Sequence, residues 1–349
     1  MRYRGKYSLF DPNKIHTYPV AGRRNRVRGP DLVYPSDALA APEARLEDAV
    51  RAGVAAVADA VIAARAADAP VVLFCGAHPI KNGLGPLIID LLERGMVTLV
   101  ATNGAGAIHD FELALIGETS EDVPDALPKG RFGMAYEFCY FNEAVNIGHA
   151  EGLGFGESLG RTIEDPAFRA QVFSRVERAG APSSFAHPEF SVLAAAYRGQ
   201  IPMTVHATIG TDVVDQHPSF DAAAKGGASG RDLLIFTNEI SKMTDGGVVL
   251  NLSCAVTGPE VLLKAMSMAG NVGRGARGIV TADFDLREAC PEAMRDESAV
   301  HYYYRDQKSI VMRIPAAFGG TGYYIQGDHR ATWPALYRAI VQRATGERE

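Results

Sequence analysis

One stretch near the start of the chain combines the apolar pattern of strands with that of helices. Two short apolar runs, at 71–74 and 97–101, flank an amphipathic segment over 84–94. Each run leads into a turn rich in small residues, at 76–83 and 103–107. This order predicts a strand, a helix and a second strand, which are the elements of a βαβ unit. Because open α/β sheets bind ligands at the carboxyl ends of parallel strands, both turns are candidate binding sites.

The same alternation continues to the end of the chain. Apolar runs predict further strands at 202–206, 247–252, 278–282 and 309–314. Helical spacing predicts helices over 45–67, 166–179, 187–196, 231–244, 260–269 and 333–343. About six strands alternating with helices predict an α/β fold with a doubly wound, mostly parallel sheet flanked by helices.

The chain shows no linker that would divide this sheet. Residues 1–44 are polar, interrupted by Pro and Gly, and carry a basic cluster that consists of Arg23, Arg24, Arg26 and Arg28. We expect 1–44 to form an N-terminal extended arm on its own subunit or on a neighbour, with a partly disordered leader as the alternative. We expect 45–349 to form a single domain. The acidic, Pro-bearing segment 119–129 is predicted as a loop.

Composition narrows the classes of partner. Of the 349 residues, 47% are hydrophobic and 22% charged, with a formal net charge of -6. This balance gives no reason to expect nucleic acid or an anionic membrane as a partner. No apolar run approaches the roughly 18 residues that a membrane span needs, and the N-terminus lacks the apolar core of a signal peptide. The four cysteines form no CxxC pair, so a reduced, cytoplasmic protein is expected.

The turn at 103–107 is the first candidate for a nucleotide. Its sequence, Asn-Gly-Ala-Gly-Ala, permits close approach of a ligand to the backbone, just ahead of a predicted helix. Free N–H groups and the helix dipole favour phosphate at such a position. Tight packing of the chain is the alternative explanation. Two further segments offer carboxylates suited to ribose hydroxyls: Thr281-Ala282-Asp283, at the predicted end of a strand, and Gly327-Asp328, before the final helix.

His109 and Asp110 follow this turn directly and are the first catalytic candidates. An imidazole at this place can act as a general base, because its free pKa lies near neutrality. The alternative is that His109 caps the helix or makes a local hydrogen bond.

A second polar group lies on the loop after 202–206. Asp212, Asp215, His217 and Asp221 cluster there, with His206 just upstream. Carboxylates around a pocket suit a cationic amine substrate. Two alternatives remain open: a metal site built from His206, Asp215 and His217, and a plain acidic loop.

The run 296–305 combines acids with aromatic residues. Asp296, Glu297 and Tyr302 would suit a box for an aliphatic ammonium group. A strand or an interface patch of tyrosines is the alternative.

Several of these motifs resemble the deoxyhypusine synthase family over most of the chain from about residue 68. The resemblance is carried by Gly83-Leu84, by Leu91-Leu92-Glu93-Arg94-Gly95-Met96-Val97, by the Gly/Ala turn that ends in Asp110, and by Asp328 with Trp333-Pro334 and Leu336. More distantly, Gly104-Ala105 to His109-Asp110, followed by Glu112, resembles the NAD-dependent ornithine cyclodeaminase domain fused to some arginine dihydrolases.

The resemblance implies a Rossmann-like sheet that binds NAD, in a homo-oligomer (a dimer of dimers) with sites at subunit interfaces. It implies cofactor-binding roles for Asn103, Gly104, Ala105, Gly106, Asp283 and Asp328. Asp285 is an alternative to Asp283. From their places in turns after strands or at a strand end, we also expect six further residues to bind the cofactor: Gly76, Ala77, His78, Gly258, Thr281 and Ala282. His109 falls where the family has a functional Glu, and Asp212 or Asp215 falls near its amine-binding Asp. We therefore expect His109, Asp110 and Asp215 to be catalytic, and Asp212, His217, Asp296, Glu297 and Tyr302 to bind the substrate.

The sequence also departs from that family. The family forms an imine with a Lys in a Ser-Trp-Gly-Lys context, whereas the matching region 299–305 has no Lys and the nearest is Lys308. The family's catalytic His is replaced near 258–260. We therefore expect a NAD-dependent enzyme that oxidises the C–N carbon of an amine or amino acid to an imine, which is then transferred, cyclised or hydrolysed. The alternatives are a catalytically silent NAD-binding regulator and a metal-dependent hydrolase using His206, Asp215 and His217.

Overall fold

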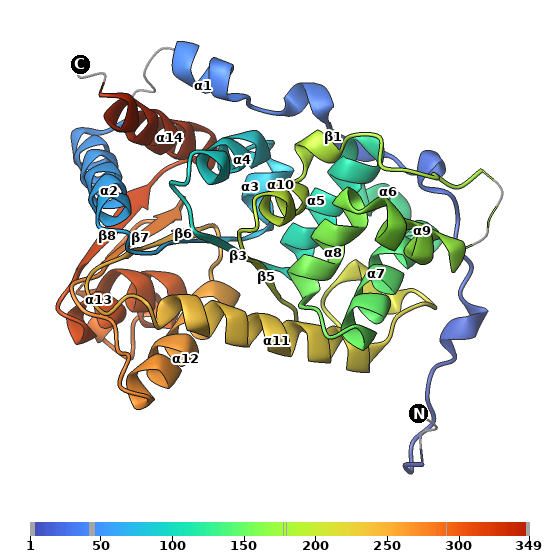
Figure 1. The fold of residues 1–349 in the computed structure, drawn as a ribbon. Helices are drawn as coiled ribbons and strands as arrows, with labels where there is room; N and C mark the ends of the chain where they lie inside the picture. The colour runs from blue at the N-terminus through green and yellow to red at the C-terminus, as the bar shows by residue number, and fades with distance from the viewer. Residues whose placement is uncertain (1–3, 42–45, 177, 179, 291, 347–349) are drawn as a thin grey trace.

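The structure is a computed structural model that describes residues 4–41, 46–176, 178, 180–290 and 292–346. A six-stranded sheet crosses its centre, with helices on both sides (Figure 1). The strands are β2 Val71–Cys75, β3 Leu99–Asn103, β5 Met203–His206, β6 Val248–Leu252, β7 Val280–Asp285 and β8 Thr321–Gln326. Their order across the sheet is β5-β3-β2-β6-β7-β8, and every neighbouring pair is parallel. The predicted α/β, doubly wound parallel sheet is confirmed.

This strand order has a functional consequence. Counted along the chain, the six strands follow the order 3-2-1-4-5-6, which is the order of dinucleotide-binding sheets. The order reverses between β2 and β6. In such sheets ligands bind outside the carboxyl ends of the strands, near the point of reversal.

Side chains of the central strand alternate between two core layers. Leu73 packs in the layer that contains helices α2 (Asp48–Ala66), α4 (Gly85–Glu93) and α14 (His329–Thr345). Phe74 packs in the layer that contains α11 (Ala222–Ile240) and α12 (Thr257–Asn271). In Figure 1 the first group of helices lies above the sheet and the second below it. Every residue of β2 is buried, as expected for a parallel strand covered on both faces.

The remaining helices connect or extend these layers. They are α1 Pro35–Ala40, α3 Ala77–Lys81, α5 Gly104–Ile116, α6 Val123–Ala126, α7 Phe138–Ala150, α8 Phe155–Glu164, α9 Pro166–Ser174, α10 Val192–Arg198 and α13 Ile314–Ala317. No helix among the described residues is both long and apolar enough to cross a bilayer.

The predicted strand at 309–314 is wrong. This apolar run lies in a π-helix, Gln307–Arg313, which continues into α13. A short apolar run cannot be assigned to strand or helix by periodicity alone. The last strand is instead β8, an edge strand whose only fully buried residue is Ile325, so its apolar signal was too weak to be recognised.

Several boundaries also differ from the prediction. The predicted loop at 119–129 begins as strand β4 (Glu118–Glu121), which pairs antiparallel with β1 (Asn25–Arg28). Helix α11 starts nine residues before the predicted 231, because Asp221 caps the N–H groups of Ala223 and Ala224. The turn predicted at 103–107 is the first turn of α5, with Asn103 as its cap, and the turn at 76–83 contains α3.

The predicted N-terminal arm contains β1 and α1, and it is tied to the rest of the chain. The Arg338 guanidinium donates to the carbonyl oxygens of Ala38 and Ala41, and the Val20 N–H donates to Glu137. The boundary predicted between 44 and 45 lies outside the described residues, as do residues 1–3 and the positions 177 and 179 in the helix predicted over 166–179.

Candidate active site

A cavity of about 400 Å³ lies at the carboxyl edge of the parallel strands. Its walls come from segments that directly follow strands: Lys81 follows β2, His109 follows β3 on α5, Asp212 follows β5, and Arg330 follows β8. The N-terminal segment closes another side with Arg23. Four strands of one sheet therefore bring their following residues to one cavity of a size typical for small-molecule sites.

His109 is the predicted catalytic residue that the structure places in this cavity, with its side chain 20% exposed. Its Nδ1 lies 2.7 Å from the Thr119 hydroxyl, and that hydroxyl donates its single proton to Glu112 Oε2 at 2.5 Å. The hydroxyl must therefore accept from Nδ1–H. This assigns the neutral ring its tautomer and leaves Nε2 with a lone pair and no hydrogen-bond partner among the described residues.

Burial keeps this imidazole neutral. Desolvation lowers the pKa of His109 below its ordinary value, and the Glu112 carboxylate only partly opposes this effect. Glu112 is itself paired with Arg23 at 2.6 Å, and both side chains are nearly inaccessible. A neutral His with a free nitrogen, oriented by a hydroxyl and a carboxylate, is the arrangement of a general base.

Asp110, in contrast, faces away from the cavity. Its carboxylate accepts from the Ser191 hydroxyl at 2.5 Å and from the Val192 and Leu193 N–H groups at 2.7 and 3.2 Å. It is fully buried, and burial raises its pKa to about 6. Asp110 therefore caps helix α10, and its geometry does not support the predicted catalytic role.

Asp212 and Asp215 already hold an ammonium group. The buried Lys225 of α11 donates to Asp212 Oδ2 at 2.7 Å and to Asp215 Oδ1 at 2.5 Å. Asp212 lines the cavity, whereas Asp215 does not. The two carboxylates predicted for a substrate amine thus form an internal ion pair with a lysine that the sequence pattern did not single out.

The space beside the glycines that were predicted to admit a cofactor is largely occupied by other atoms of the protein. A Cβ on Gly104 would overlap the Asp212 carboxylate, and one on Gly106 would overlap the Thr102 hydroxyl. A Cβ on Gly76 would overlap the Ser253 carbonyl, and one on Gly258 would crowd Phe74. Of the predicted residues in this region, only Ala105 lines the cavity. The amino end of α5 is thus covered by a resident carboxylate, which takes the place expected for a phosphate.

Thr281, Ala282 and Asp283 lie inside β7 rather than at its end, which is Asp285. The Thr281 hydroxyl donates to the Ile310 carbonyl oxygen, and Asp283 accepts from the Asn251 amide at 2.7 Å. Burial, followed by repulsion from Asp306, raises the pKa of Asp283 well above its ordinary value. Thr281 and Asp283 are buried polar residues on one face of β7, and Ala282 packs in the hydrophobic core on the other face, so none of the three is accessible to a nucleotide.

The remaining candidates are not brought to the cavity. The His206 ring stacks on Phe74 at 5.4 Å, and the His217 Nδ1 bonds Ser219 at 2.8 Å. Burial lowers the pKa of each imidazole to about 4. No group of His, Cys, Asp and Glu among the described residues is arranged to hold a metal ion, so the ligand set proposed for a hydrolase is not assembled.

Asp296, Glu297 and Tyr302 also lie away from the cavity. They belong to a surface segment in which the Tyr302 hydroxyl donates to Glu297 at 3.0 Å. The predicted ammonium box is therefore not part of this site. At the ends of β2 and β8, His78 and Asp328 are exposed.

Sequence reasoning missed part of the site. Thr119, Lys81 and Arg330 carried no motif, and Arg23 was recognised only as a member of a basic cluster. Arg23 reaches Glu112 across 89 positions because β1 pairs with β4. No pattern in the sequence around Glu112 or Thr119 indicates this contact.

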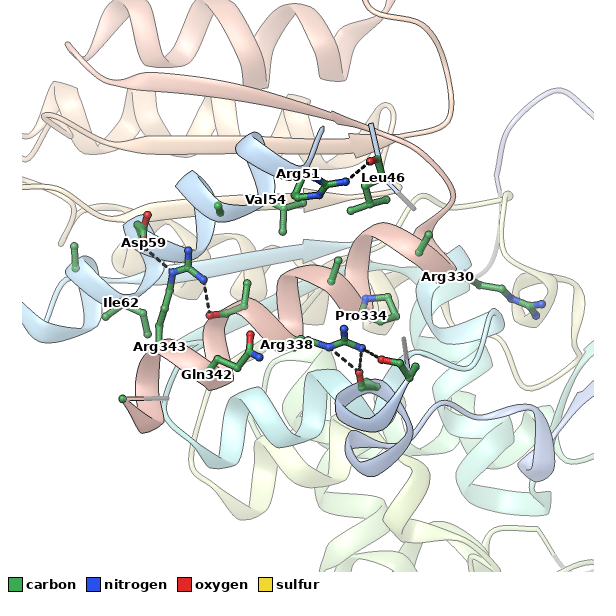
Figure 2. A pocket seen from close by; sticks show the side chains of 18 of the residues that line it. Leu46, Arg51, Val54, Asp59, Ile62, Arg330, Pro334, Arg338, Gln342 and Arg343 are labelled. Atoms are coloured by element: carbon green, nitrogen blue, oxygen red, sulfur yellow. Dashed lines mark hydrogen bonds and ion pairs between the residues drawn. The ribbon is translucent and has the colours of Figure 1, made fainter. Parts of the chain in front are cut away.

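A larger groove, of about 870 Å³, lies elsewhere, between α2 and α14. Figure 2 shows two of its arginines bonded within the same chain: Arg343 to Asp59 at 2.6 Å, and Arg338 to the carbonyl oxygens of Ala38 and Ala41. Its floor is mostly alanine and aliphatic. Arg330 lines both cavities, and in Figure 2 its side chain points away from the groove. Among the described residues that line the groove, Asp59 is the only Asp, Glu, His or Cys, and it is paired with Arg343, so the groove offers no free acid or base for catalysis.

No protein-family model matches the sequence, and no curated protein matches it. Among solved structures, ArgZ, an arginine dihydrolase from the ornithine–ammonia cycle in cyanobacteria, is 15% identical with a TM-score of 0.47, over 86% of this chain and 32% of ArgZ. AgrE in its ternary complex with ornithine and NAD+ is 14% identical with a TM-score of 0.48, over 86% of this chain and 34% of AgrE.

A conserved LOR/SDH protein from Methanococcus maripaludis S2 is 13% identical with a TM-score of 0.48, over 89% of this chain and 74% of that protein. The chain thus spans about a third of the length of ArgZ and AgrE. Similarity at this level assigns no activity or ligand to the chain. ArgZ is of the class named in the more distant sequence resemblance, whereas none of these three is described as a deoxyhypusine synthase.

Proposed function

We propose that the protein is a NAD-dependent enzyme that oxidises the C–N carbon of an amine or amino acid to an imine. The observation that carries this proposal is His109, whose free Nε2 borders a cavity at the carboxyl edge of a sheet with the dinucleotide-binding strand order. Substrate binding, proton transfer and exclusion of water are then tasks of this chain, and hydride acceptance is the task of the cofactor when bound.

His109 has a defined part in this reaction. Oxidation of an amine to an imine removes a hydride from carbon and a proton from nitrogen. The His109 Nε2 takes the proton, and the resulting imidazolium is stabilised by the Thr119 hydroxyl and the nearby Glu112 carboxylate. Arg23 holds Glu112 in place by the buried ion pair.

The residues left open for a cofactor lie at the ends of β2 and β8. His78 and Asp328 are exposed there, and the adjacent His329 is buried with an Nδ1 that has no hydrogen-bond partner. The Asp328 carboxylate suits ribose hydroxyls. The amino end of α5, filled by Asp212, does not belong to this set.

The structure also bears on the fate of the imine. Lys308 does not line the cavity; its ammonium lies over the Tyr302 ring, 2.7 Å from the centroid. We therefore favour hydrolysis or cyclisation over transfer through this lysine. The oligomeric state stays a prediction.

The test is NAD reduction by the purified chain with ornithine, lysine and putrescine, followed by absorbance. We expect turnover with at least one of them, and a loss of about 10²–10⁴-fold in kcat in His109→Gln, the usual contribution of a general base. Because burial lowers the pKa of His109, activity should persist as the pH falls to 6.5 and decline only below it.

The control is His187→Gln, which alters an imidazole on the surface that is 3.3 Å from Glu189 and should leave turnover unchanged. Full activity of His109→Gln would remove the base from the proposal. Binding of NAD without reduction by any amine would identify the silent regulator instead.

A further inference from the structure

The acidic residues of the cavity are satisfied by the protein itself. Glu112 is paired with Arg23, and Asp212 with Lys225. Glu121 accepts from the Tyr18 hydroxyl at 2.7 Å and from the Gly133 N–H at 2.9 Å. No carboxylate in the wall is therefore left to hold a substrate ammonium.

The cations of the cavity are less completely satisfied. The side chains of Lys81 and Arg330 make no hydrogen bond or ion pair with the described residues, whereas Arg26 is paired with Asp122 at 3.0 Å. Lys81 is half-buried and so cannot be fully solvated. The charged side chains left to bind a ligand in this wall are thus positive.

Arg23 provides an independent observation. The residue is only 8% exposed. Its Nη1 donates to Glu112 and its Nε to Asn25, at 2.6 and 2.8 Å. Its Nη2 is buried without any partner. Leaving a buried guanidinium N–H unpaired is costly, and a bound acceptor would remove the cost.

We propose that the cavity binds the carboxylate of its substrate through Arg23 Nη2 and Lys81, so that the substrate is an amino acid rather than a simple polyamine. This inference rests on the proposed function only in calling the ligand a substrate. Guanidinium and ammonium groups are the side chains that recognise carboxylates best. Arg23, Lys81 and His109 line one cavity, and Arg23 is linked to His109 through Glu112 and Thr119, so a carboxylate at Arg23 and an amine at His109 are placed to belong to one molecule.

This assignment changes the expectation from the sequence. The acidic loop at Asp212 and Asp215 predicted a cationic substrate, but Lys225 neutralises that loop. The specificity group comes instead from the N-terminal segment, which enters the cavity as β1 pairs with β4.

The experiment measures binding by calorimetry with the whole chain, with and without NAD, for three matched pairs: ornithine and putrescine, lysine and cadaverine, arginine and agmatine. The members of each pair differ only by the carboxylate. We expect at least one amino acid to bind about tenfold or more tightly than its amine partner, because a charge-assisted hydrogen bond contributes at least that much.

Two variants locate the effect. Arg23→Lys keeps a cation beside Glu112 but removes Nη2, and Lys81→Met removes the free ammonium without touching a buried pair. Each should bring the amino acid close to the affinity of its amine. Arg24→Met, on the same segment but outside the cavity, is the control and should change neither affinity.

Three outcomes would overturn the inference: amines that bind as tightly as their amino acids, no binding by any of the three amino acids, or amino-acid affinity unchanged in both variants.

A phosphate group of the cofactor is the other anion that Arg23 and Lys81 could bind. Nicotinamide mononucleotide and nicotinamide riboside, which differ by that phosphate, distinguish it. If the variants weaken only the mononucleotide, the anion belongs to the cofactor. Amino-acid binding that depends on Lys81, without any NAD reduction, would leave this inference intact and refute the proposed function.

Discussion

The two halves of the sheet use polar residues in opposite ways. After β2, β3 and β5, the chain continues into segments that carry Lys81, His109 and Asp212 to the wall of one cavity. In β6 and β7, Asn251 and Asp283 lie inside the strands, opposite each other in register, and bond each other. The segments after β2, β3 and β5, like Arg330 after β8, present polar groups to the cavity, whereas the interiors of β6 and β7 enclose theirs.

The difference comes from the position of a residue relative to the end of its strand. Side chains inside a strand stand perpendicular to the sheet and enter the adjacent helical layer. Asp283 lies two residues before the end of β7 and is 1% exposed. His109 lies six residues beyond the end of β3, on a helix that runs along the cavity. A displacement of a few residues therefore separates an accessible group from a buried one.

The largest effect should come from the buried ion pair in the first half. Lys225→Met removes the cation from Asp212 and Asp215, whose side chains are each 6% exposed. Stranding buried carboxylates costs about 3–5 kcal/mol. We expect the free energy of unfolding in urea to fall by that amount.

A matched control is Lys129→Met. Its Lys129–Asp125 pair has the same 2.7 Å separation as Lys225–Asp212, but the two side chains are 54% and 51% exposed. Exposed pairs contribute about 0–1 kcal/mol, so this variant should be nearly as stable as the wild type. Equal losses in the two variants would show that burial does not distinguish them.

The next largest effect tests the enclosed polar residues of β6 and β7, and it depends on pH. Burial and Asp306 raise the pKa of Asp283 in the folded protein, so its contribution to stability is present at low pH and declines as the pH rises above about 4. Asp283→Asn cannot titrate. As the pH rises, the free energy of unfolding of this variant should increase relative to that of the wild type by up to about 1.4 kcal/mol per pH unit. The total gain between pH 5 and 7 is then at most about 3 kcal/mol.

The measurement is urea unfolding of both proteins across this pH range. Asp296→Asn, on an exposed turn, is the control and should show no such gain. A constant difference between Asp283→Asn and the wild type at every pH would mean that Asp283 titrates normally and that the second half is open to water.

The smallest effect sharpens the open half. Thr119→Val removes the acceptor for the His109 Nδ1–H, so the tautomer with a free Nε2 is no longer favoured. We expect kcat to fall about tenfold, the equivalent of one net hydrogen bond, with KM little changed. Thr119→Ser keeps the hydroxyl and should restore kcat. If Thr119→Ser did not restore kcat, packing of the Thr119 methyl group, and not its hydroxyl, would account for the loss.

Sequence patterns predicted the sheet better than the site. Five of the six central strands follow from apolar runs, because parallel strands buried on both faces have nearly continuous apolar sequences. The edge strand β8 was not predicted, since only Ile325 of its residues is buried and its sequence Thr-Gly-Tyr-Tyr-Ile-Gln contains no continuous apolar run. The apolar run at 309–314 was misassigned because a short buried run fits helix and strand equally.

For the site, His109 followed from its place after a small-residue turn, since loops after parallel strands meet at one edge. Asp110, one residue on, has the same sequence context but the opposite direction, because α5 turns it toward α10. Side-chain direction on a helix changes by about 100° per residue, so adjacency in sequence does not imply a shared role.

The sequence by itself determined the alternation of strands and helices, the parallel sheet and the turn that leads to His109. Those features depend on local periodicity and on short connections. Only the tertiary structure decided that Lys225 occupies the acidic loop, that Asp283 is enclosed, and that Arg23 reaches Glu112 across 89 positions. Such contacts join segments far apart in the chain, and their energies depend on burial that no local pattern records.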